Sequence, residues 1–495
     1  MPFVEALSMI FTLQVIAALI AGLLIGVVLG SLPGIGGILG MAIILPFTVE
    51  MDGLSAIIGL IAIYLGAMYG GAVSAILFNI PGTNAAVATT LDGYPLSKKG
   101  HAEEALTISA LSSAIGGILA GIALLLTFPY LSPLLDLFGT PQKFLVAFLG
   151  IAILPLIARG SQFKSIFAAS FGLLITTIGL APMNLQMRYS FGSTFLESGI
   201  DFIAIIIGLF AVTEMALLAG KDRSNISGEN KESFSIEWNE AKKGGEYISN
   251  NIFPIIKSSF IGTTVGMIPG AGAAISTFVS YSEAVRSSNK PESFGEGNRL
   301  GLLSAEGANN ATAIGSLIPV LAFGIPGSSA SAVILGGMIL HGVVPGPVLF
   351  SSEAAFLQSL FLATILLSLF VAVTGIFGVR YLSYVTKIDK QIIIPVVIIF
   401  SITGATTLNL NPVDILTAAI FGIIGYLFKK YNYPVISLLL GAILGGIMET
   451  TLFRSLQLGT PAEVFGDPVS LVLIIFIITL LLLPHIKAPK ISPSH

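Results

Sequence analysis

Gly30-Ser31-Leu32-Pro33-Gly34-Ile35-Gly36 interrupts one apolar segment of this chain, and Phe78-Asn79-Ile80-Pro81-Gly82-Thr83 interrupts the next. The second half repeats both breaks in the same order, as Gly266-Met267-Ile268-Pro269-Gly270-Ala271-Gly272 and Phe323-Gly324-Ile325-Pro326-Gly327-Ser328. Pro removes a backbone hydrogen bond and Gly weakens a helix, so each pair predicts a broken helix. Interrupted hydrophobic segments at corresponding positions of two halves are typical of a transporter's binding site.

The composition indicates an integral membrane protein. Of 495 residues, 54% are hydrophobic and 10% are charged, and the mean hydropathy is +0.94. About 20 apolar residues span a bilayer, so we expect an all-α polytopic membrane protein with ten to twelve transmembrane helices. The clearest candidate spans are 10–30, 105–130, 165–182, 198–220, 350–378, 391–409, 413–428, 432–449 and 467–485, and the topology adds a crossing at about 142–158.

Several classes of function are disfavoured by the same composition. The net charge is only −3 and no basic block occurs, which disfavours nucleic acid as a partner. The chain has no cysteine, so it has no disulfide, thiolate metal site or catalytic thiol. No Lys or Arg precedes Lys98, and we therefore interpret the first apolar stretch as a retained helix and not a cleaved signal peptide.

Basic residues predict the topology, because they accumulate in short cytoplasmic loops. Placing Lys98 and Lys99 inside puts nearly all other basic residues inside as well. The exceptions are Lys143, Arg188 and Arg454.

The charge bias also predicts that the two halves run in opposite directions. Between its two breaks the first half carries Glu50 and Asp52, whereas the second carries Arg286, Lys290 and Arg299. We therefore expect two inverted-topology repeats with re-entrant or broken helices. The predicted domains are a first repeat at 1–220, a cytoplasmic linker containing Trp238 at 221–246, a second repeat at 247–466, and an extra C-terminal helix and tail at 467–495.

Small polar residues follow the second break of each half. A helix that starts at Thr83 or Ser328 would have a favoured capping residue and free N–H groups, which suit a carboxylate. Asn amides can both donate to a carboxylate and offer oxygen to a cation. The predicted substrate site comprises Pro33, Gly34, Pro81, Gly82, Thr83, Asn84, Pro269, Gly270, Asn309, Asn310, Pro326, Gly327, Ser328 and Ser329. A Na⁺ ion is expected near Gly36, Thr83, Asn309 and Ser328, with no cofactor.

Other readings of these residues stay open. Each Pro-Gly pair alone fits a tight surface turn between helices. Glu306 is either a functional carboxylate inside the membrane or an ordinary carboxylate at the headgroups. We interpret Asp92 as a turn residue, and Glu214 needs a partner that the sequence does not identify. The glycines Gly441, Gly445 and Gly446 are expected to allow close helix contact.

Across nearly its whole length the chain resembles the large membrane subunit of the tripartite tricarboxylate transporters, the TctA type. The motifs that carry the resemblance are Gly30 to Gly37, Tyr69-Gly70-Gly71, Ile80 to Thr83, Leu91 to Pro95, Glu306 with Asn309-Asn310, Gly324 to Gly327 and His341 to Pro347. The family pattern usually has Pro before the Glu, where this chain has Ala305. The resemblance implies a bacterial inner-membrane protein that imports citrate or other carboxylates on an ion gradient. Its implied partners are a small four-helix membrane subunit and a periplasmic solute-binding protein.

The expected mechanism is alternating access, in which one block that contains the paired breaks moves against a scaffold. The coupling ion is Na⁺ or H⁺. The alternatives are an anion channel built from the same broken helices, or a carboxylate symporter that works without a binding protein. An enzyme is disfavoured because the chain lacks His-Glu-x-x-His and Gly-x-Ser-x-Gly motifs.

Overall fold

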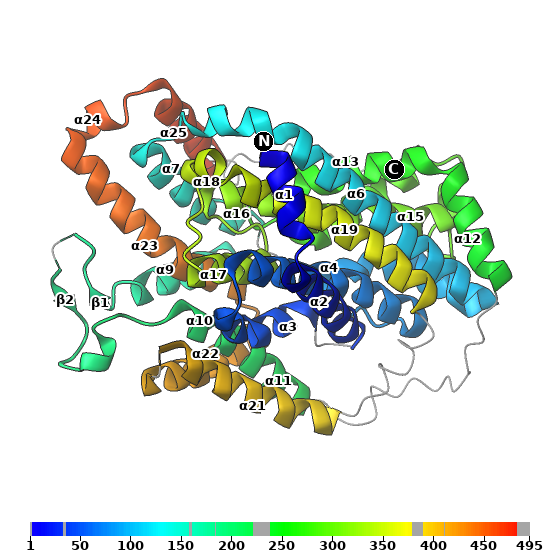
Figure 1. Ribbon diagram of the computed structural model, residues 1–495, viewed down its shortest axis with the longest axis horizontal. Helices are drawn as coiled ribbons and strands as arrows, with labels where there is room; N and C mark the ends of the chain where they lie inside the picture. The colour runs from blue at the N-terminus through cyan, green and yellow to red at the C-terminus, as the bar shows by residue number, and fades with distance from the viewer. Residues whose placement is uncertain are drawn as a thin grey trace, which may run out of the picture. The chain divides into compact units, whose positions relative to one another are not determined.

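The computed structural model is almost entirely helical (Figure 1). The described residues are 2–32, 36–157, 161–183, 185–220, 238–378, 390–409 and 411–482. Pro33 and Gly34 of the predicted site lie outside these residues, as does most of the predicted linker. The chain divides into two compact units, 1–133 with 200–430 and 134–199 with 431–495. Each unit therefore contains parts of both predicted repeats.

Unit 1 holds all four Pro-Gly breaks. Its helices from the first half are α1 (Pro2–Ile10), α2 (Leu13–Ser31), α3 (Gly36–Ile44), α4 (Gly53–Phe78), α5 (Val87–Leu96), α6 (Ala102–Leu135, which ends at the boundary), α10 (Phe202–Ile206) and α11 (Thr213–Ala219). Those from the second half are α12 (Trp238–Asn250), α13 (Ile252–Gly266), α14 (Gly272–Ser287), α15 (Arg299–Gly315), α16 (Leu317–Phe323), α17 (Ser329–Leu340), α18 (Pro347–Ser352), α19 (Ala354–Phe377), α21 (Lys390–Asn409) and α22 (Pro412–Lys430).

Unit 2 is smaller and is built round α23. Its elements are α7 (Thr140–Ala152), α8 (Leu154–Ile157), α9 (Gln162–Ile175), the hairpin strands β1 (Gly179–Leu180) and β2 (Met187–Arg188), α23 (Val435–Leu458), α24 (Pro461–Val464) and α25 (Pro468–Leu482). Helix α23 packs against α7 and α9, and α25 packs against α7.

The second unit is held by polar contacts as well as by packing. Ser165 and Ser437 join α9 to α23 through a 2.9 Å hydroxyl contact. The Arg188 guanidinium makes two hydrogen bonds to Glu449, at 2.7 and 3.1 Å. Formation of this pair raises the pKa of Arg188 and keeps the hairpin charge compensated.

Seven described helices are long and apolar enough to cross a membrane. They cover 13–31, 53–78, 84–135, 202–219, 354–377, 412–430 and 435–458. Seven shorter apolar helices of 10–17 residues accompany them. The predicted polytopic all-α membrane class is therefore confirmed, while the number of crossings stays a prediction.

Glycine lets the helices of each half approach closely. A Cβ at Gly26 on α2 would lie 2.2 Å from the Ile63 carbonyl oxygen on α4. In the second half a Cβ at Gly266 on α13 would lie 2.4 Å from the Thr312 carbonyl oxygen on α15. Small residues at helix contacts are the usual means of tight packing in membranes.

In unit 2 the expectation of close glycine contacts is confirmed for Gly441 and Gly445, whose added Cβ atoms would each meet a neighbour at 2.2 Å. It is wrong for Gly446, which has open space.

The structure shows the conformation at the end of the predicted linker and the partner of Glu214. Trp238 begins α12, so the end of the predicted linker is helical, and its ring packs against Phe377 at 5.9 Å. Glu214 on α11 forms an ion pair with Lys429 on α22, the partner that the sequence could not identify. This pairing explains how a carboxylate is tolerated in an apolar segment.

Candidate functional site

The second break of the first half forms tip 1, residues 81–84. Helix α4 ends at Phe78, and Asn79 takes the left-handed conformation with φ of 55°. Thr83 precedes a 3-10 turn, Asn84–Ala86, that leads into α5. The Thr83 side chain makes no capping hydrogen bond, so the predicted capping role is wrong for Thr83. The Gly82 N–H donates to the Gly71 carbonyl at 3.3 Å, and a Cβ on Gly82 would lie only 2.0 Å from the Gly30 carbonyl oxygen. Tip 1 is thus packed against Gly30 at the end of α2, which is the first residue of the first break in its own half.

Tip 2, residues 326–329, has the same construction in the second half. Helix α16 ends at Phe323, and Gly324 takes the left-handed conformation with φ of 68°. Ser328 caps α17: its Oγ accepts the Ser331 N–H at 3.1 Å, and the Ser331 Oγ accepts the Ser328 N–H at 2.8 Å. The predicted capping role of Ser328 is confirmed, and the cap occupies one of the amides that the sequence argument left free for an anion. The N–H groups of Ser329 and Ala330 still lack an intrahelical acceptor by helix geometry.

The first break of the second half lies against tip 2. The Gly270 N–H donates to the Gly327 carbonyl at 3.1 Å. Pro269, which precedes it, is half-buried. In each half, therefore, the two breaks that are far apart in sequence lie next to each other.

Each tip also contacts the opposite half. Thr277 on α14 donates through Oγ1 to the Ala85 carbonyl at 3.1 Å, next to tip 1. The Tyr64 hydroxyl on α4 lies 3.4 Å from the Ser328 Oγ in tip 2. Helix α17 packs against α3 and α4, just as α5 packs against α14 and α15. This reciprocal packing supports two equivalent halves, and their opposite orientation in a membrane stays a prediction.

Buried polar atoms without a protein partner occur in tip 1 and on α15. Asn309 and Asn310 on α15 are fully buried. The Asn309 amide nitrogen donates to the Met68 carbonyl at 3.4 Å. Among the described residues, no hydrogen-bond partner is found for the Asn309 Oδ1, both side-chain polar atoms of Asn310 or the Thr83 Oγ1. Because buried polar atoms are normally paired, these atoms mark a place where a ligand or water can bind.

The four residues expected to hold Na⁺ do not form one ligand set through the contacts of the described chain. Gly36 lies beside Gly82 of tip 1, with 3.5 Å from its added Cβ to the Gly82 carbonyl oxygen. Ser328 instead contacts Tyr64. Asn309 contacts Met68 and Glu306. A sodium site at Gly36, Thr83, Asn309 and Ser328 stays a prediction.

Asp92 has a role that the sequence did not reveal. It lies within α5, is fully buried, and is not the turn residue that we expected. Its Oδ1 accepts the N–H groups of Gly295, Gly297 and Asn298 at 2.9, 2.9 and 2.7 Å, and its Oδ2 accepts the Tyr281 hydroxyl at 2.9 Å. The φ angles of Gly295 and Gly297 are 87° and 96°, which only glycine adopts easily and which turn successive N–H groups toward one anion.

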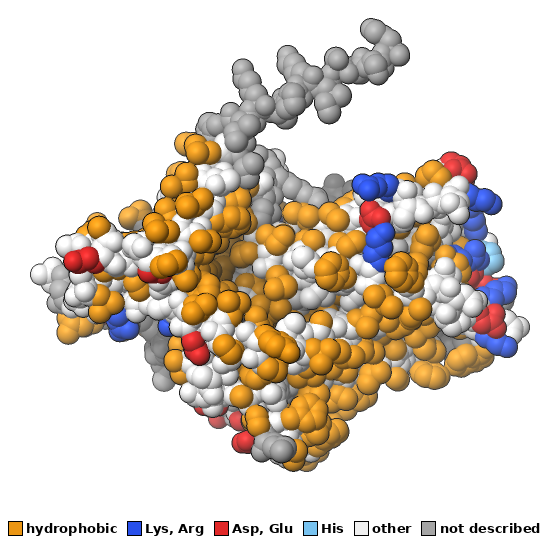
Figure 2. Space-filling model, turned by 90° about the horizontal axis from the view of Figure 1, so that it is seen from above, with side chains coloured by type: hydrophobic (Ala, Val, Ile, Leu, Met, Phe, Trp, Pro, Cys, Tyr) orange, Lys and Arg blue, Asp and Glu red, His pale blue; other side chains and the backbone are white. Residues whose placement is uncertain are grey.

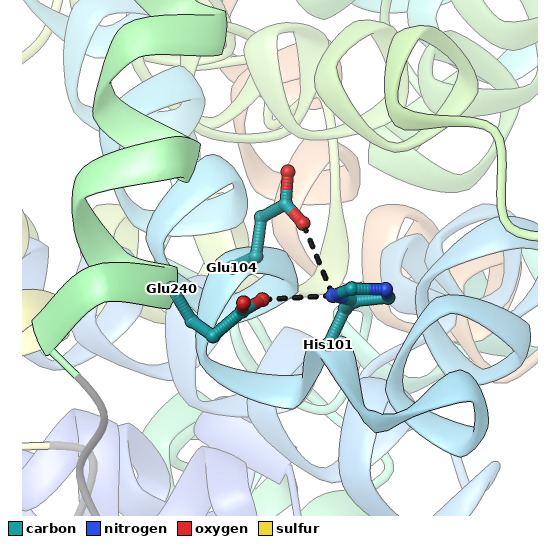
Figure 3. Close-up of side chains that lie close together, drawn as sticks. All are labelled: His101, Glu104 and Glu240. Carbon is teal, nitrogen blue, oxygen red and sulfur yellow. Dashed lines mark hydrogen bonds and ion pairs between the residues drawn. The ribbon is translucent and has the colours of Figure 1, made fainter.

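One acidic cluster with metal-ligand chemistry lies at the charged end of unit 1 (Figure 3). It consists of His101, Glu104 and Glu240, whose ligand atoms lie within 4.8 Å of one another. Cations already neutralise it: Arg299 donates to both oxygens of Glu104, and Lys243 pairs with Glu240. The hydrogen bond from His101, followed by that from Lys243, lowers the pKa of Glu240. The contact between His101 and Glu240, at 2.7 Å, joins α12 to the residue before α6.

The charged side chains gather at this end of unit 1, while the surface beside it is largely hydrophobic (Figure 2). The linked charged residues are His101, Glu104, Glu240, Lys243 and Arg299. A charged end next to an apolar flank is the pattern of a protein that leaves a bilayer at that end.

Comparison with known proteins agrees with the architecture. Residues 16–440 match the tripartite tricarboxylate transporter TctA family. An Agrobacterium vitis protein described as an uncharacterized 52.8 kDa protein in the TAR-I ttuC' 3' region is 31% identical over 479 residues, which cover 95% of this chain and 93% of the relative. A second A. vitis protein, from the TAR-II ttuC' 3' region, is 31% identical over 46% of this chain and 97% of its own length. No solved structure matches the chain. The chain belongs to the tripartite tricarboxylate transporter TctA family, the large membrane subunit of these transporters.

Proposed function

We propose that this subunit imports tricarboxylates or other small carboxylates across the bacterial inner membrane, with tips 1 and 2 forming the substrate site. The observation that carries the proposal is the paired construction of the tips. Each begins a helix after a left-handed residue, each lies against a first break, and each contacts the opposite half.

The chemistry of the tips suits a carboxylate. Free N–H groups at a helix start and the positive end of the helix dipole favour an anion. The Asn310 amide nitrogen and the Thr83 hydroxyl add donors that have no partner in the described chain, and the Asn309 Oδ1 is an unpaired acceptor. The sequences of both tips contain no Lys or Arg, so a multiply charged substrate would need a cotransported cation, which supports coupling to Na⁺ or H⁺.

The division into units supports alternating access by an elevator-like motion. All described parts of the breaks belong to unit 1, and none belongs to unit 2. A carrier of this kind needs one compact body that holds the substrate and a second body against which it moves. We assign the first role to unit 1 and the second to unit 2. A small membrane subunit and a periplasmic binding protein would complete the transporter.

Uptake by membrane vesicles that contain all three subunits tests the substrate site. Thr83→Trp and Ser328→Trp place a bulky ring at each tip and should reduce citrate uptake at least tenfold. Ser249→Trp, on the exposed face of α12, is the matched control and should transport like the wild type. Undiminished uptake in both tip variants would reject the site.

The same vesicles separate the competing functions. Saturable uptake that follows an imposed ion gradient supports a carrier, whereas linear flux down the anion gradient alone supports a channel. Omitting the binding protein separates a tripartite system from a stand-alone symporter, because only the latter keeps its full uptake rate.

A further inference from the structure

A buried carboxyl group lies where α5, α6 and α15 meet. Glu306 on α15 is fully buried. Thr89 on α5 donates to one carboxyl oxygen, and the Ser113 Oγ on α6 donates to the other at 2.7 Å. Asn309 is a weaker third donor at 3.5 Å. Every one of these partners is neutral. The depth of Glu306 in the membrane stays a prediction.

The charged groups on the neighbouring elements are Asp92 on α5, Glu103 and Glu104 on α6, Lys257 on α13, and Glu283 and Arg286 on α14. Four of them, Asp92, Glu104, Lys257 and Glu283, bind other groups. Asp92 accepts backbone N–H groups, whereas Glu104 and Lys257 form ion pairs with Arg299 and Glu283. Helix α14 presents Ser276 and Ser280 to α15. On α4 the Tyr69 hydroxyl is buried and has no hydrogen-bond partner among the described residues. Within the described chain, no Lys, Arg or His forms an ion pair with Glu306.

An isolated carboxylate in such a place is strongly disfavoured, since burying an unpaired charge costs far more than burying the neutral acid. A cation must therefore accompany it. Ions of the size of Ca²⁺ or Na⁺ sit about 2.4 Å from each ligand oxygen and would have to separate the carboxyl oxygens from their hydroxyl partners. A proton fits the hydrogen-bond distances that are present.

We propose that Glu306 is the cation-binding group of this carrier and that its cation is a proton. The inference rests on the proposed transport function and deepens it. Bound H⁺ makes the side chain a neutral acid whose O–H donates to the Thr89 or Ser113 oxygen. Release of H⁺ restores the carboxylate, which accepts from both hydroxyls.

The location of Thr89 links the proton to the substrate. Thr89 lies six residues after Thr83 of tip 1, about 9 Å along a helix. Gain or loss of the proton at Glu306 changes the bond that holds α5, the helix that carries tip 1. Substrate at the tip and the proton at Glu306 therefore act on the same helix.

The test uses the three-subunit transporter in proteoliposomes, with the wild type, Glu306→Gln and the control Glu50→Gln, an exposed carboxylate. Two quantities are measured: citrate exchange at equal pH, and citrate accumulation driven by an alkaline interior. One pH unit corresponds to at most a tenfold accumulation per proton. We expect the wild type and Glu50→Gln to accumulate citrate. In Glu306→Gln the loss of accumulation should be at least ten times larger than any loss of exchange.

Accumulation by Glu306→Gln that follows the pH gradient as in the wild type would overturn the proposal. So would wild-type accumulation that follows a Na⁺ gradient and ignores pH. If the wild type catalyses no exchange, the transport function itself is wrong, which is a separate result.

If Glu306→Gln does not fold, infrared spectroscopy of the wild type decides the question. We expect a protonated carboxyl band at neutral pH that shifts on labelling with ¹³C-glutamate, and its absence would overturn the proposal.

Discussion

Replacing Asp92 tests how the structure ties the helix of tip 1 to the second half. Asp92 is buried in α5 and accepts three backbone N–H groups and one tyrosine hydroxyl, all at 2.7–2.9 Å. The donors lie on the 295–298 segment and on α14, which belong to the second half. We expect Asp92→Asn and Asp92→Ala to destabilise unit 1, and by different amounts.

The magnitudes follow from the hydrogen bonds. A hydrogen bond to a charged group contributes about 1.5–3 kcal/mol and one to a neutral group about 1 kcal/mol. Asn keeps an oxygen for the N–H groups but loses the charge, and the lower desolvation cost of the amide offsets part of that loss. We expect about 2 kcal/mol for Asp92→Asn. Ala leaves the Tyr281 hydroxyl and three N–H groups of the partly exposed 295–298 segment without their acceptor. Because water can reach part of this segment, each loss should cost about 1 kcal/mol, and Asp92→Ala should cost about 4 kcal/mol.

The assay is equilibrium unfolding of purified protein in mixed detergent micelles, followed by circular dichroism. Asp52→Asn is the matched control. Asp52 is exposed and caps α4 by accepting the Ser55 N–H, and Asn caps a helix equally well. Free energies of unfolding for both Asp92 variants within about 0.5 kcal/mol of the control would refute the reasoning.

Two further predictions concern helix packing and pH. Gly26→Ala should lower the free energy of unfolding by about 1–3 kcal/mol, because the added Cβ would meet the Ile63 carbonyl oxygen at 2.2 Å. Gly446→Ala adds its Cβ to open space and should be neutral or stabilising. Equal effects of the two variants in the same unfolding assay would contradict the packing. The lowered pKa of Glu240 means that its carboxylate stabilises the docked α12 above the usual value of about 4.5 and that this contribution is lost as the pH falls through the lowered pKa. Trp238 is the chain's single Trp and begins α12, so its fluorescence reports on this helix. In the wild type the emission should shift to longer wavelength in acid, and in Glu240→Gln it should show no such step. The same acid shift in both proteins would count against docking through Glu240.

The positions of helices were predictable from the sequence where a continuous apolar run covers the whole helix. The expected spans 350–378 and 391–409 correspond to α19 (Ala354–Phe377) and α21 (Lys390–Asn409). The expected span 165–182 was too long, because α9 ends at Ile175 and the chain then forms the β1–β2 hairpin. Apolar composition does not distinguish the end of a helix from an apolar turn, so such boundaries need tertiary information.

The sequence predicted the backbone breaks of the candidate site. It did not predict which residues the side chains and segments of the site contact. Asn79 and Gly324 occupy equivalent left-handed positions, and these residue types favour that conformation. The pairing of the first break with the second in each half depends on packing between segments far apart in sequence. The same is true of Asp92, since its role depends on the Gly295 and Gly297 backbone, about 200 residues away.

The central claim is that tips 1 and 2 bind one carboxylate, and substrate protection of single cysteines tests it most directly. The chain has no cysteine, so Thr83→Cys and Ser328→Cys each create one reactive group, and Ser249→Cys is the control. We expect citrate to slow maleimide labelling at both tips and to leave labelling of the control unchanged. Labelling of both tip cysteines at the same rate with and without carboxylates, in a preparation that still transports them, would contradict it.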